Sequence, residues 1–330
     1  MPAFLGIDVA KDTLAVVLLG PKTPRKTSIP NTPSGFTRLL HWLATQHVDE
    51  IVVCLEATGT YSDDVALALH DAGFRVFVVN PARIAAYAKS QLARNKTDSA
   101  DAALIARFAQ AEAATLTPWT PPDPAVRELR ALVRHLDVLQ QARQAERNRQ
   151  GAPGHPHVVA EALAAHIRFL DQQIADIERQ ISDHIDTHPE LSKQHELLQS
   201  IGGIGSLTAT RILAEAGDLT RFANARAVAA YAGLTPRQYS SGTSVHRRTR
   251  LSKIGNAALR RALFFPAIVA KQHNVVLQVF CARLAARGLA PKAIVGAAMR
   301  KLLQLAYGVL ASGRPFDAEL ALAHMTQKGA

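Results

Sequence analysis

Four acidic side chains lie at the ends of predicted strands and helices, where together they could hold metal ions. Asp8 follows an apolar run that is typical of a buried strand, and Glu56 ends a second such run. Asp98 and Asp101 are three positions apart, so on a helix both carboxylates share one face. Hard Mg²⁺ prefers oxygen ligands, and two ions roughly 3.5–4 Å apart can clamp the attacking and leaving oxygens of a phosphodiester. The four residues therefore predict a Mg²⁺ site for phosphodiester chemistry.

Each of these acids also has a purely structural interpretation. Asp98 fits a first-turn partner of a helix dipole, Asp8 a turn residue, and Glu56 a solvated strand end. The metal site is favoured because all four acids occur together and in one order.

Ser241 is a second candidate for chemistry, because it precedes Gly242 and is followed by a cluster of arginines. Serine is a poor nucleophile without activation or charge stabilisation. The glycine allows close approach of the backbone, and arginines neutralise charge that grows in a transition state. A surface Ser-Ser-Gly loop beside phosphate-binding arginines gives the same pattern, so the residues alone leave both interpretations open. The basic residues expected to contact nucleic acid are Arg237, Arg247, Arg248, Arg250, Lys253, Arg260 and Arg261.

The positive charge of the chain is confined to its second half. Between Leu219 and Phe316 there are 16 Lys and Arg residues and no Asp or Glu. The whole chain has 38 basic and 27 acidic residues, so removing this stretch leaves 22 basic against 27 acidic. A segregated basic region predicts a polyanionic partner, whereas a solvated basic surface does not explain the absence of acids.

A glycine-rich turn precedes this basic region. Apolar residues flank Gly202, Gly203 and Gly205, and a helical pattern follows. The sequence resembles a helix-hairpin-helix, in which Gly203 and Gly205 would expose backbone N–H groups to a DNA phosphate. A plain glycine turn between two helices is the alternative.

The elements that must position the acids follow an α/β pattern. A strand hairpin and a third strand are followed by alternating helices and strands, with acids on the first and fourth strands. This is the order of a ribonuclease-H-like fold. The expected strands are Leu5–Val9, Thr13–Leu19, Arg25–Ile29, Ile51–Leu55 and Arg75–Val79, and the expected helices begin near Pro33, Ser62, Pro81 and Asp98.

Four prolines between 118 and 124 mark a boundary, because proline cannot continue a helix. A polar helix over Val126–Arg149 follows, and then a helix with an apolar seam from Leu163 to Ile185 that is close to a heptad repeat. The seam fits either an antiparallel helical hairpin or an intermolecular coiled coil. We therefore expect an α/β domain at 1–117, a linker and helical coiled-coil segment at 118–192, and a mostly helical domain at 193–330.

Composition excludes several other classes of protein. The two cysteines form no CxxC pair, so a disulfide framework or a zinc site is not expected. The sequence shows neither a signal-peptide pattern at its start nor an uninterrupted apolar run of 18 residues. We expect a cytoplasmic protein with access to the nucleoid of a bacterium, and no membrane partner.

Six motifs, in one order from Phe4 to about Arg314, give the chain a family resemblance. They are Gly-Ile-Asp-Val-Ala-Lys, Leu-Glu-Ala-Thr-Gly, Lys-Thr-Asp-Ser-Ala-Asp-Ala, Ile-Gly-Gly-Ile-Gly, Ala-Gly-Leu-Thr-Pro with Ser-Gly, and Ser-Lys-Ile-Gly-Asn-Ala-Ala-Leu-Arg-Arg-Ala-Leu. The chain resembles the insertion-sequence-110 family of transposases, which is related to Piv-type DNA invertases. The resemblance implies a RuvC-like DEDD domain, a coiled-coil segment and a C-terminal serine transposase domain.

The resemblance also assigns roles to residues and implies partners. Asp8, Glu56, Asp98 and Asp101 match the acidic tetrad that binds Mg²⁺, for which Mn²⁺ can substitute. Ser241 matches the nucleophile, although the adjacent Ser240 leaves the register open by one residue. The implied partners are double-stranded donor and target DNA, a noncoding guide called bridge RNA, and further copies of the chain, as dimers that pair into tetramers.

The sequence leaves two other functions open. In the first, a RuvC-like junction-resolving nuclease keeps the acidic tetrad but uses water as the nucleophile, so no covalent protein–DNA adduct forms. In the second, the chain is a catalytically inactive nucleic-acid-binding protein, and replacing Asp8 by Asn changes nothing measurable.

Overall fold

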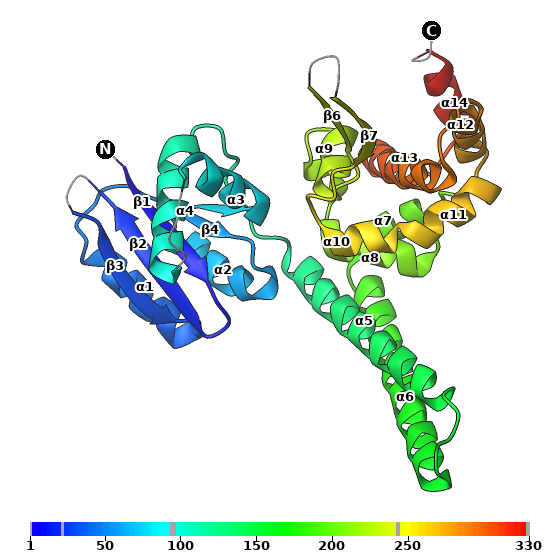
Figure 1. Cartoon of the computed structure of the whole chain (residues 1–330), viewed down its shortest axis with the longest axis horizontal. Coiled ribbons are helices and arrows are strands. Elements are labelled where there is room, and N and C mark those ends of the chain that lie inside the picture. The colour runs from blue at the N-terminus through cyan, green and yellow to red at the C-terminus, as the bar shows by residue number, and fades with distance from the viewer. Residues whose placement is uncertain (1, 21–22, 93–96, 242–244, 328–330) are drawn as a thin grey trace. The chain divides into compact units, whose positions relative to one another are not determined.

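The computed structural model describes residues 2–20, 23–92, 97–241 and 245–327 (Figure 1). Side chains are not described at Thr60, Ser240 and Ser241, nor at 245–248 and 324–327. The chain forms two compact units, Met1–Pro121 and Pro122–Ala330, each with its own apolar core. The predicted segments 118–192 and 193–330 therefore fall largely within one unit.

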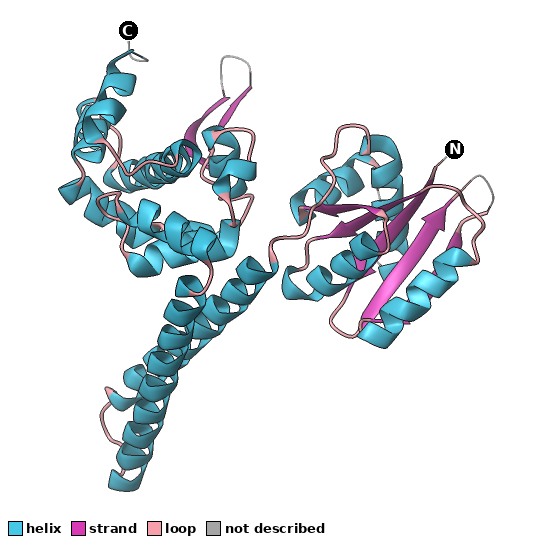
Figure 2. Ribbon diagram, turned by 180° about the vertical axis from the view of Figure 1, so that it is seen from behind, coloured by secondary structure: helices cyan, strands magenta, loops and turns pink. Residues whose placement is uncertain are grey.

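A five-stranded mixed sheet with the order β3-β2-β1-β4-β5 forms the centre of the first unit (Figure 2). β1 pairs antiparallel with β2 and parallel with β4. This arrangement confirms the predicted ribonuclease-H-like fold, and each expected strand is found within two residues of its predicted ends. The strands are β1 Ala3–Val9, β2 Thr13–Leu19, β3 Arg25–Pro30, β4 Ile51–Glu56 and β5 Arg75–Val79.

Helices cover both faces of this sheet, because alternate strand residues point to opposite faces and both sets are largely apolar. Leu5 and Ile7 of β1 share a core with apolar residues of α1 and α2. On the opposite face, Val52 and Cys54 of β4 share a core with residues of α3 and α4. The helices are α1 Pro33–Ala44, α2 Asp63–Asp71, α3 Pro81–Ser90 and α4 Asp98–Glu112, with a short 3₁₀ turn at Gly59–Ser62.

The contact between α4 and β1 is unusually close at Gly6. A Cβ atom at this position would lie 2.1 Å from the carbonyl oxygen of Ala102 and 2.4 Å from the backbone nitrogen of Ala106. The helix backbone therefore rests directly on the strand backbone, and only glycine leaves the necessary space.

The second unit begins with a helical hairpin made of α5, Pro124–Gln150, and α6, His157–Asp186. Ile174 and Ile181 of the predicted seam are only 4% and 6% exposed, and they belong to the same core as Leu129 and Leu136 of α5. The intramolecular alternative is therefore correct: the apolar seam of α6 packs against α5 of the same chain.

The rest of the second unit is mostly helical, as predicted, with one two-stranded hairpin. The hairpin, β6 with β7, was not predicted. The elements are α7 Pro189–Gln199, α8 Ser206–Ala216, a 3₁₀ turn at Leu219–Arg221, α9 Ala225–Tyr231, β6 Pro236–Ser241, β7 Val245–Leu251, α10 Ala257–Ala262, α11 Phe264–His273, α12 Val275–Ala286, α13 Pro291–Ser312 and α14 Ala318–Gln327.

By length and composition alone, the helix α13 is able to cross a membrane. The segment α10–α11 together with α12 meets the same criterion if this bent pair is counted as one span. Half of the apolar stretch of α13 is buried inside this unit. Leu302, Leu303 and Ala306 are fully buried in its core. A core helix of a globular unit meets the same criterion, so the observation is weak evidence for a membrane span.

Replacing Gly6 by Ala should destabilise the first unit by about 3 kcal/mol, the upper end of the usual cost of overpacking, because the new methyl group must push α4 away from β1. Urea unfolding followed by tryptophan fluorescence measures this change, since both tryptophans, Trp42 and Trp119, lie in that unit. The matched control is Gly20→Ala, where the nearest atom to a new Cβ is 3.9 Å away. Equal stabilities of the two variants would contradict the packing argument.

Candidate functional site

Asp8 and Glu56 lie at neighbouring strand ends on one face of the sheet. Ile7 pairs with Leu55 in the parallel ladder between β1 and β4, and each acid is the next residue along its strand. By strand alternation, Asp8 shares the face of Gly6, and Glu56 shares the face of Cys54. Both acids therefore belong to the face that α4 covers, and both are partly exposed.

Asp98 and Asp101 occupy the first turn of α4. Thr97 caps this helix by accepting a hydrogen bond from the backbone N–H of Ala100 at 3.2 Å. Asp98 lies one helical turn before Ala102, which contacts Gly6. Phe4 packs against the cluster that contains Phe108, near the other end of α4, so helix and strand run in opposite directions.

This packing places the first turn of α4 at the same end of the sheet as Asp8 and Glu56. Three elements that are distant in sequence thus bring the four predicted acids to one region. The helix dipole also favours negative charge in the first turn, where Asp98 and Asp101 lie. These two residues can therefore stabilise the helix as well as bind a metal ion.

Ser241 is the last residue of β6 and pairs with Val245 across the hairpin. The sequence led us to expect a loop here, but Ser240 and Ser241 have strand backbone, and Gly242 lies outside the described residues. The side chains of both serines, and of Arg247 and Arg248 on β7, also lie outside the described part of the chain. The candidate nucleophile belongs to the second unit, whereas the acids belong to the first.

Backbone hydrogen bonds fix the base of this hairpin. The N–H groups of Ser252 and Lys253 donate to the carbonyls of Thr235 and Gly233 at 2.9 and 3.1 Å. Next to them, Gly255 has a φ of +140°, and a Cβ atom there would lie 2.2 Å from the carbonyl oxygen of Tyr231. Only glycine allows this approach, which holds the segment after β7 against the end of α9.

A buried carboxylate, Glu215 of α8, lies beneath the hairpin base. Its two oxygens accept hydrogen bonds from Arg134 of α5 at 3.1 and 3.3 Å and from the Nδ2 of Asn256 at 2.9 Å. Tyr231 donates its hydroxyl to the backbone carbonyl of Glu215 at 3.0 Å. Asn256 also caps α10 by accepting from the N–H of Leu259. This Glu215 network connects the helical hairpin α5–α6 to the segment that follows β7.

The charge of Glu215 is set by opposing effects. Burial raises the pKa of the carboxyl, but the hydrogen bonds from Arg134 and Asn256 and the charges of Arg134 and Arg130 outweigh it, so its pKa lies below the ordinary value. Sequence reasoning did not select this residue. The only available signal was an acidic residue in the apolar helix pattern of 206–216.

Comparisons with known proteins agree over nearly the whole chain. The transposase model DEDD_Tnp_IS110 matches residues 5–152, and the model described as transposase IS116/IS110/IS902 family matches residues 195–281. The pilin gene-inverting protein of Moraxella bovis is 35% identical over 317 residues, which cover 95% of this chain and 97% of that protein. The chain belongs to the IS110 family of transposases.

Other relatives support the same family. The pilin gene-inverting protein of Moraxella lacunata is 34% identical over 317 residues, or 95% of this chain and 97% of that protein. The transposase of insertion element IS1111A from Coxiella burnetii is 32% identical over 115 residues, or 35% of this chain and 30% of that protein. RuvC of T. thermophilus, solved with a Holliday junction, covers 36% of this chain and all of its own at 16% identity and a TM-score of 0.29, a likeness too slight to support a conclusion.

Membership of the IS110 family makes this chain a transposase or invertase that acts on DNA, and its DEDD domain implies a divalent metal ion. The four predicted residues fit such an ion by donor type, because all are carboxylates and hard cations prefer oxygen. Within the described ranges, no three acidic, histidine or cysteine side chains converge closely enough to form a metal site. The structure thus brings the four acids to one end of the sheet without assembling them into a metal-coordination site.

The predicted nucleic-acid residues divide into two groups. Arg237, Arg250, Lys253, Arg261 and Gly205 are exposed, whereas Arg260 and Gly203 have structural tasks. Arg260 donates to the backbone carbonyl of Ala232 at 3.0 Å, and burial, with a contribution from Arg261, lowers its pKa. Gly203 has a φ of +101°, and a Cβ atom there would lie 2.4 Å from the Cβ of Ala270 on α11, so close packing explains this glycine. The nucleic-acid contacts themselves stay predictions.

The Glu215 network should stabilise the second unit only when the carboxyl is ionised. Because folding lowers the pKa of Glu215, this stabilisation is complete above its ordinary pKa of 4.5 and is lost as the pH falls through the folded-state value. Glu215→Gln should therefore lower the free energy of unfolding at pH 7 by about 2 kcal/mol, and the difference from wild type should shrink below about pH 4.5.

Urea unfolding followed by circular dichroism at 222 nm, repeated from pH 3 to pH 7, measures this effect. Glu178→Gln is the matched control, because Glu178 is exposed on α6. A difference between wild type and Glu215→Gln that stays constant over this pH range would contradict the assignment.

Proposed function

We propose that this chain cuts and rejoins DNA strands with Ser241 as the nucleophile and with Asp8, Glu56, Asp98 and Asp101 as ligands of Mg²⁺. The observation that carries the proposal is the convergence of β1, β4 and the first turn of α4, which gives four carboxylates a common region. The hairpin supports the second part, because a strand with a fixed base ends at Ser241, and its partner strand bears arginines.

The proposed reaction is a transesterification. The Oγ of Ser241 forms a bond to phosphorus while the bond from phosphorus to a deoxyribose oxygen breaks. The serine proton leaves to solvent, and the departing oxygen takes up a proton. Attack by a hydroxyl of another strand reverses these steps and releases the serine, so strands are exchanged without net hydrolysis.

The chain's own residues stabilise charge during this exchange. In the proposal, arginines of β7, the strand that pairs with β6, neutralise phosphate charge as it grows. Mg²⁺, or Mn²⁺ in its place, would supply Lewis-acid stabilisation of the phosphoryl oxygens when bound by the four carboxylates.

The partners in this proposal are double-stranded donor and target DNA and a noncoding bridge RNA. The acid-free region from Leu219 to Phe316 supports a polyanionic partner, and exposed Arg261 and Lys253 belong to it. In the proposal, base pairing by the RNA selects the DNA sequence, while basic side chains hold the backbones.

Incubation of the protein with Mg²⁺, the element's flanking RNA and labelled donor-junction DNA should give a labelled protein band on a denaturing gel. Ser241→Ala and Asp101→Asn should each reduce the band by at least about 100-fold, because one removes the nucleophile and the other a proposed metal ligand. Ser240→Ala is the matched control and should keep the band. Omitting the RNA should abolish the band.

Two outcomes of this experiment would contradict parts of the proposal. Cleaved DNA without any adduct, unaffected by either serine substitution, would indicate a nuclease that uses water. A band that persists without RNA would contradict the proposal that a guide RNA is needed.

We also propose that the chain self-associates through the outer surface of its helical hairpin. The seam of α6 is used within the chain, but Val138 of α5 and Phe169 of α6 are 60% and 59% exposed. A second copy of the chain that covers these side chains would remove apolar surface from water. Dimers that pair into tetramers are the proposed assembly.

Phe169→Glu should reduce the mass measured by sedimentation velocity, because a charge in an apolar interface is costly to bury. Phe265→Glu is the matched control, since Phe265 is 73% exposed on α11 and lies outside the hairpin. An unchanged mass for Phe169→Glu, or an equal loss in both variants, would contradict this assembly.

A further inference from the structure

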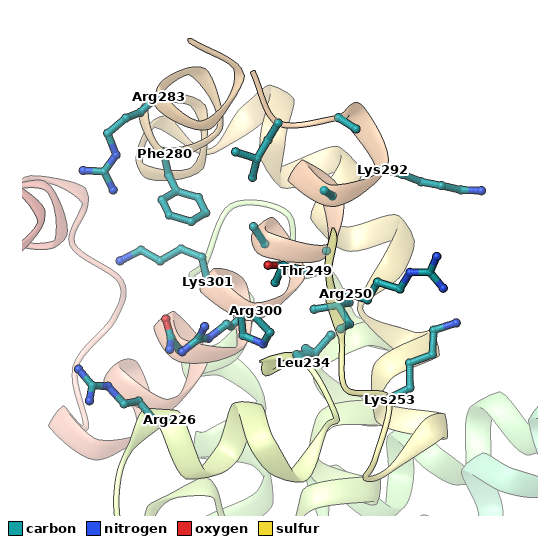
Figure 3. Close-up of a pocket in the computed structure, with 18 of the residues that line it drawn as sticks. Arg226, Leu234, Thr249, Arg250, Lys253, Phe280, Arg283, Lys292, Arg300 and Lys301 are labelled. Atoms are coloured by element: carbon teal, nitrogen blue, oxygen red, sulfur yellow. The ribbon is translucent and has the colours of Figure 1, made fainter. Parts of the chain in front are cut away.

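A large cationic pocket lies in the second unit, beside the base of the β6–β7 hairpin (Figure 3). Its volume is about 2040 Å³, and it is lined by residues of α9, the hairpin, α12 and α13. No acidic residue is among its described lining residues. The basic residues that line it are Arg226, Arg250, Lys253, Arg283, Lys292, Arg300 and Lys301.

The charges of this pocket favour an anionic ligand. For Arg250, Arg283 and Arg300 the structure gives no ion pair with an acid of the described chain. The Nε of Arg300 is buried and has no hydrogen-bond partner among the described residues. Cations gathered without acids create a strong positive potential that attracts a negatively charged ligand.

The size of the pocket favours a polymer over a small molecule. Sites for small ligands usually have volumes of roughly 300–1,000 Å³, well below the value found here. The basic residues are also spread over four elements rather than focused on one point, as Figure 3 shows for Arg226, Arg283 and Lys253. This distribution fits successive phosphates of a polynucleotide backbone.

An aromatic ring distinguishes this pocket from a simple phosphate-binding surface. Phe280 of α12 projects toward Lys301 in Figure 3, and the guanidinium carbon of Arg283 lies 5.9 Å from the centre of its ring. The partly exposed Leu251 adds apolar surface to the lining. Proteins that bind unpaired strands combine a cationic groove for the phosphates with aromatic rings and arginines on which the bases stack. The faces of unpaired bases are open to such stacking. In a duplex these faces are covered.

The pocket is also placed to act on the strand that Ser241 attacks. Pro236 and Leu251, which pair at the base of the hairpin, line it, and Ser241 ends the same strand five residues later. At about 3.3 Å per residue, the strand spans roughly 16 Å from Pro236 to Ser241. That distance corresponds to a few nucleotides of an extended strand.

We propose that this cationic pocket binds the unpaired DNA strand that flanks the phosphodiester attacked by Ser241. The inference rests on the proposed function, because that function supplies the DNA strand and the position of the cut. Phosphates contact Arg250, Arg300 and Lys292, while one base stacks on Phe280. The pocket would thereby fix how far from the cut the DNA must be unpaired.

Fluorescence anisotropy on the full-length Ser241→Ala protein tests binding without chemistry. The probes are a labelled single-stranded 15-nucleotide DNA of donor-junction sequence, its duplex, and RNA of the same sequence. Phe280→Leu should weaken single-stranded DNA binding on the order of tenfold and leave duplex binding unchanged, because it removes the stacking ring. Phe280→Tyr retains a ring and should bind as the parent does.

Arg300→Gln should weaken binding of the single strand and reduce the slope of log affinity against log salt by about 0.7, the value for one phosphate contact on a single strand. Lys271→Gln is the matched control, because it removes one positive charge from an exposed position on α11 outside the pocket. Thermal unfolding of each variant shows whether a loss of affinity reflects a loss of fold.

Unchanged affinity for single-stranded DNA in both Phe280→Leu and Arg300→Gln would overturn the inference. An effect of these variants on the RNA probe but not on the DNA probe would overturn it as well, and would assign the pocket to RNA. Failure of the proposed function is distinguishable, because it appears as a missing covalent adduct in the wild type while pocket-dependent binding by Ser241→Ala persists.

Discussion

The backbone contact between α4 and β1 is the constraint on which the acidic region depends. Gly6 lets the helix rest directly on the central strand, with Ala102 and Ala106 at the contact. Their small side chains and the absent Cβ of glycine allow this approach, and burial of Ile105 and Phe108 stabilises it. Because the helix cannot shift without separating from the strand, its first turn stays at the sheet end where Asp8 and Glu56 emerge. One glycine in a strand thus determines where a helix presents its carboxylates.

The second unit positions its candidate nucleophile by a different principle. Its hairpin carries polar and basic residues and has little apolar surface to hold it in place, so hydrogen bonds at the base replace packing. Glu215 links Arg134 of the helical hairpin to Asn256, which caps α10 next to the hairpin base. A buried carboxylate that is charged must be fully paired, because removing a single partner leaves an uncompensated charge. The network therefore couples the orientation of α5 to the segment that fixes β7.

Local patterns predicted the first unit well, because alternating apolar runs and capping residues such as Thr97 coincide with its strands and helices. They did not predict the β6–β7 hairpin, since Pro236–Ser241 and Val245–Leu251 lack alternation of apolar and polar residues. Local sequence patterns also did not predict contacts between residues that are distant in sequence. The fold shows structural contacts of Arg260 and Gly203 that the sequence did not reveal, because Arg260 donates to a backbone carbonyl and Gly203 packs against α11. The intramolecular use of the α6 seam was one of two open alternatives, and a heptad-like pattern alone does not decide between them.

Peptide mass spectrometry of the reacted protein shows whether a serine of the β6–β7 hairpin becomes covalently attached to DNA. After nuclease digestion of the DNA and cleavage by trypsin, the peptide from Gln238 to Arg247 contains Ser240, Ser241 and Ser244. Fragmentation should place a residual nucleotide on Ser241. An unmodified peptide recovered from a reaction in which the DNA has been cut, or a nucleotide on any other residue, would contradict the proposed attachment.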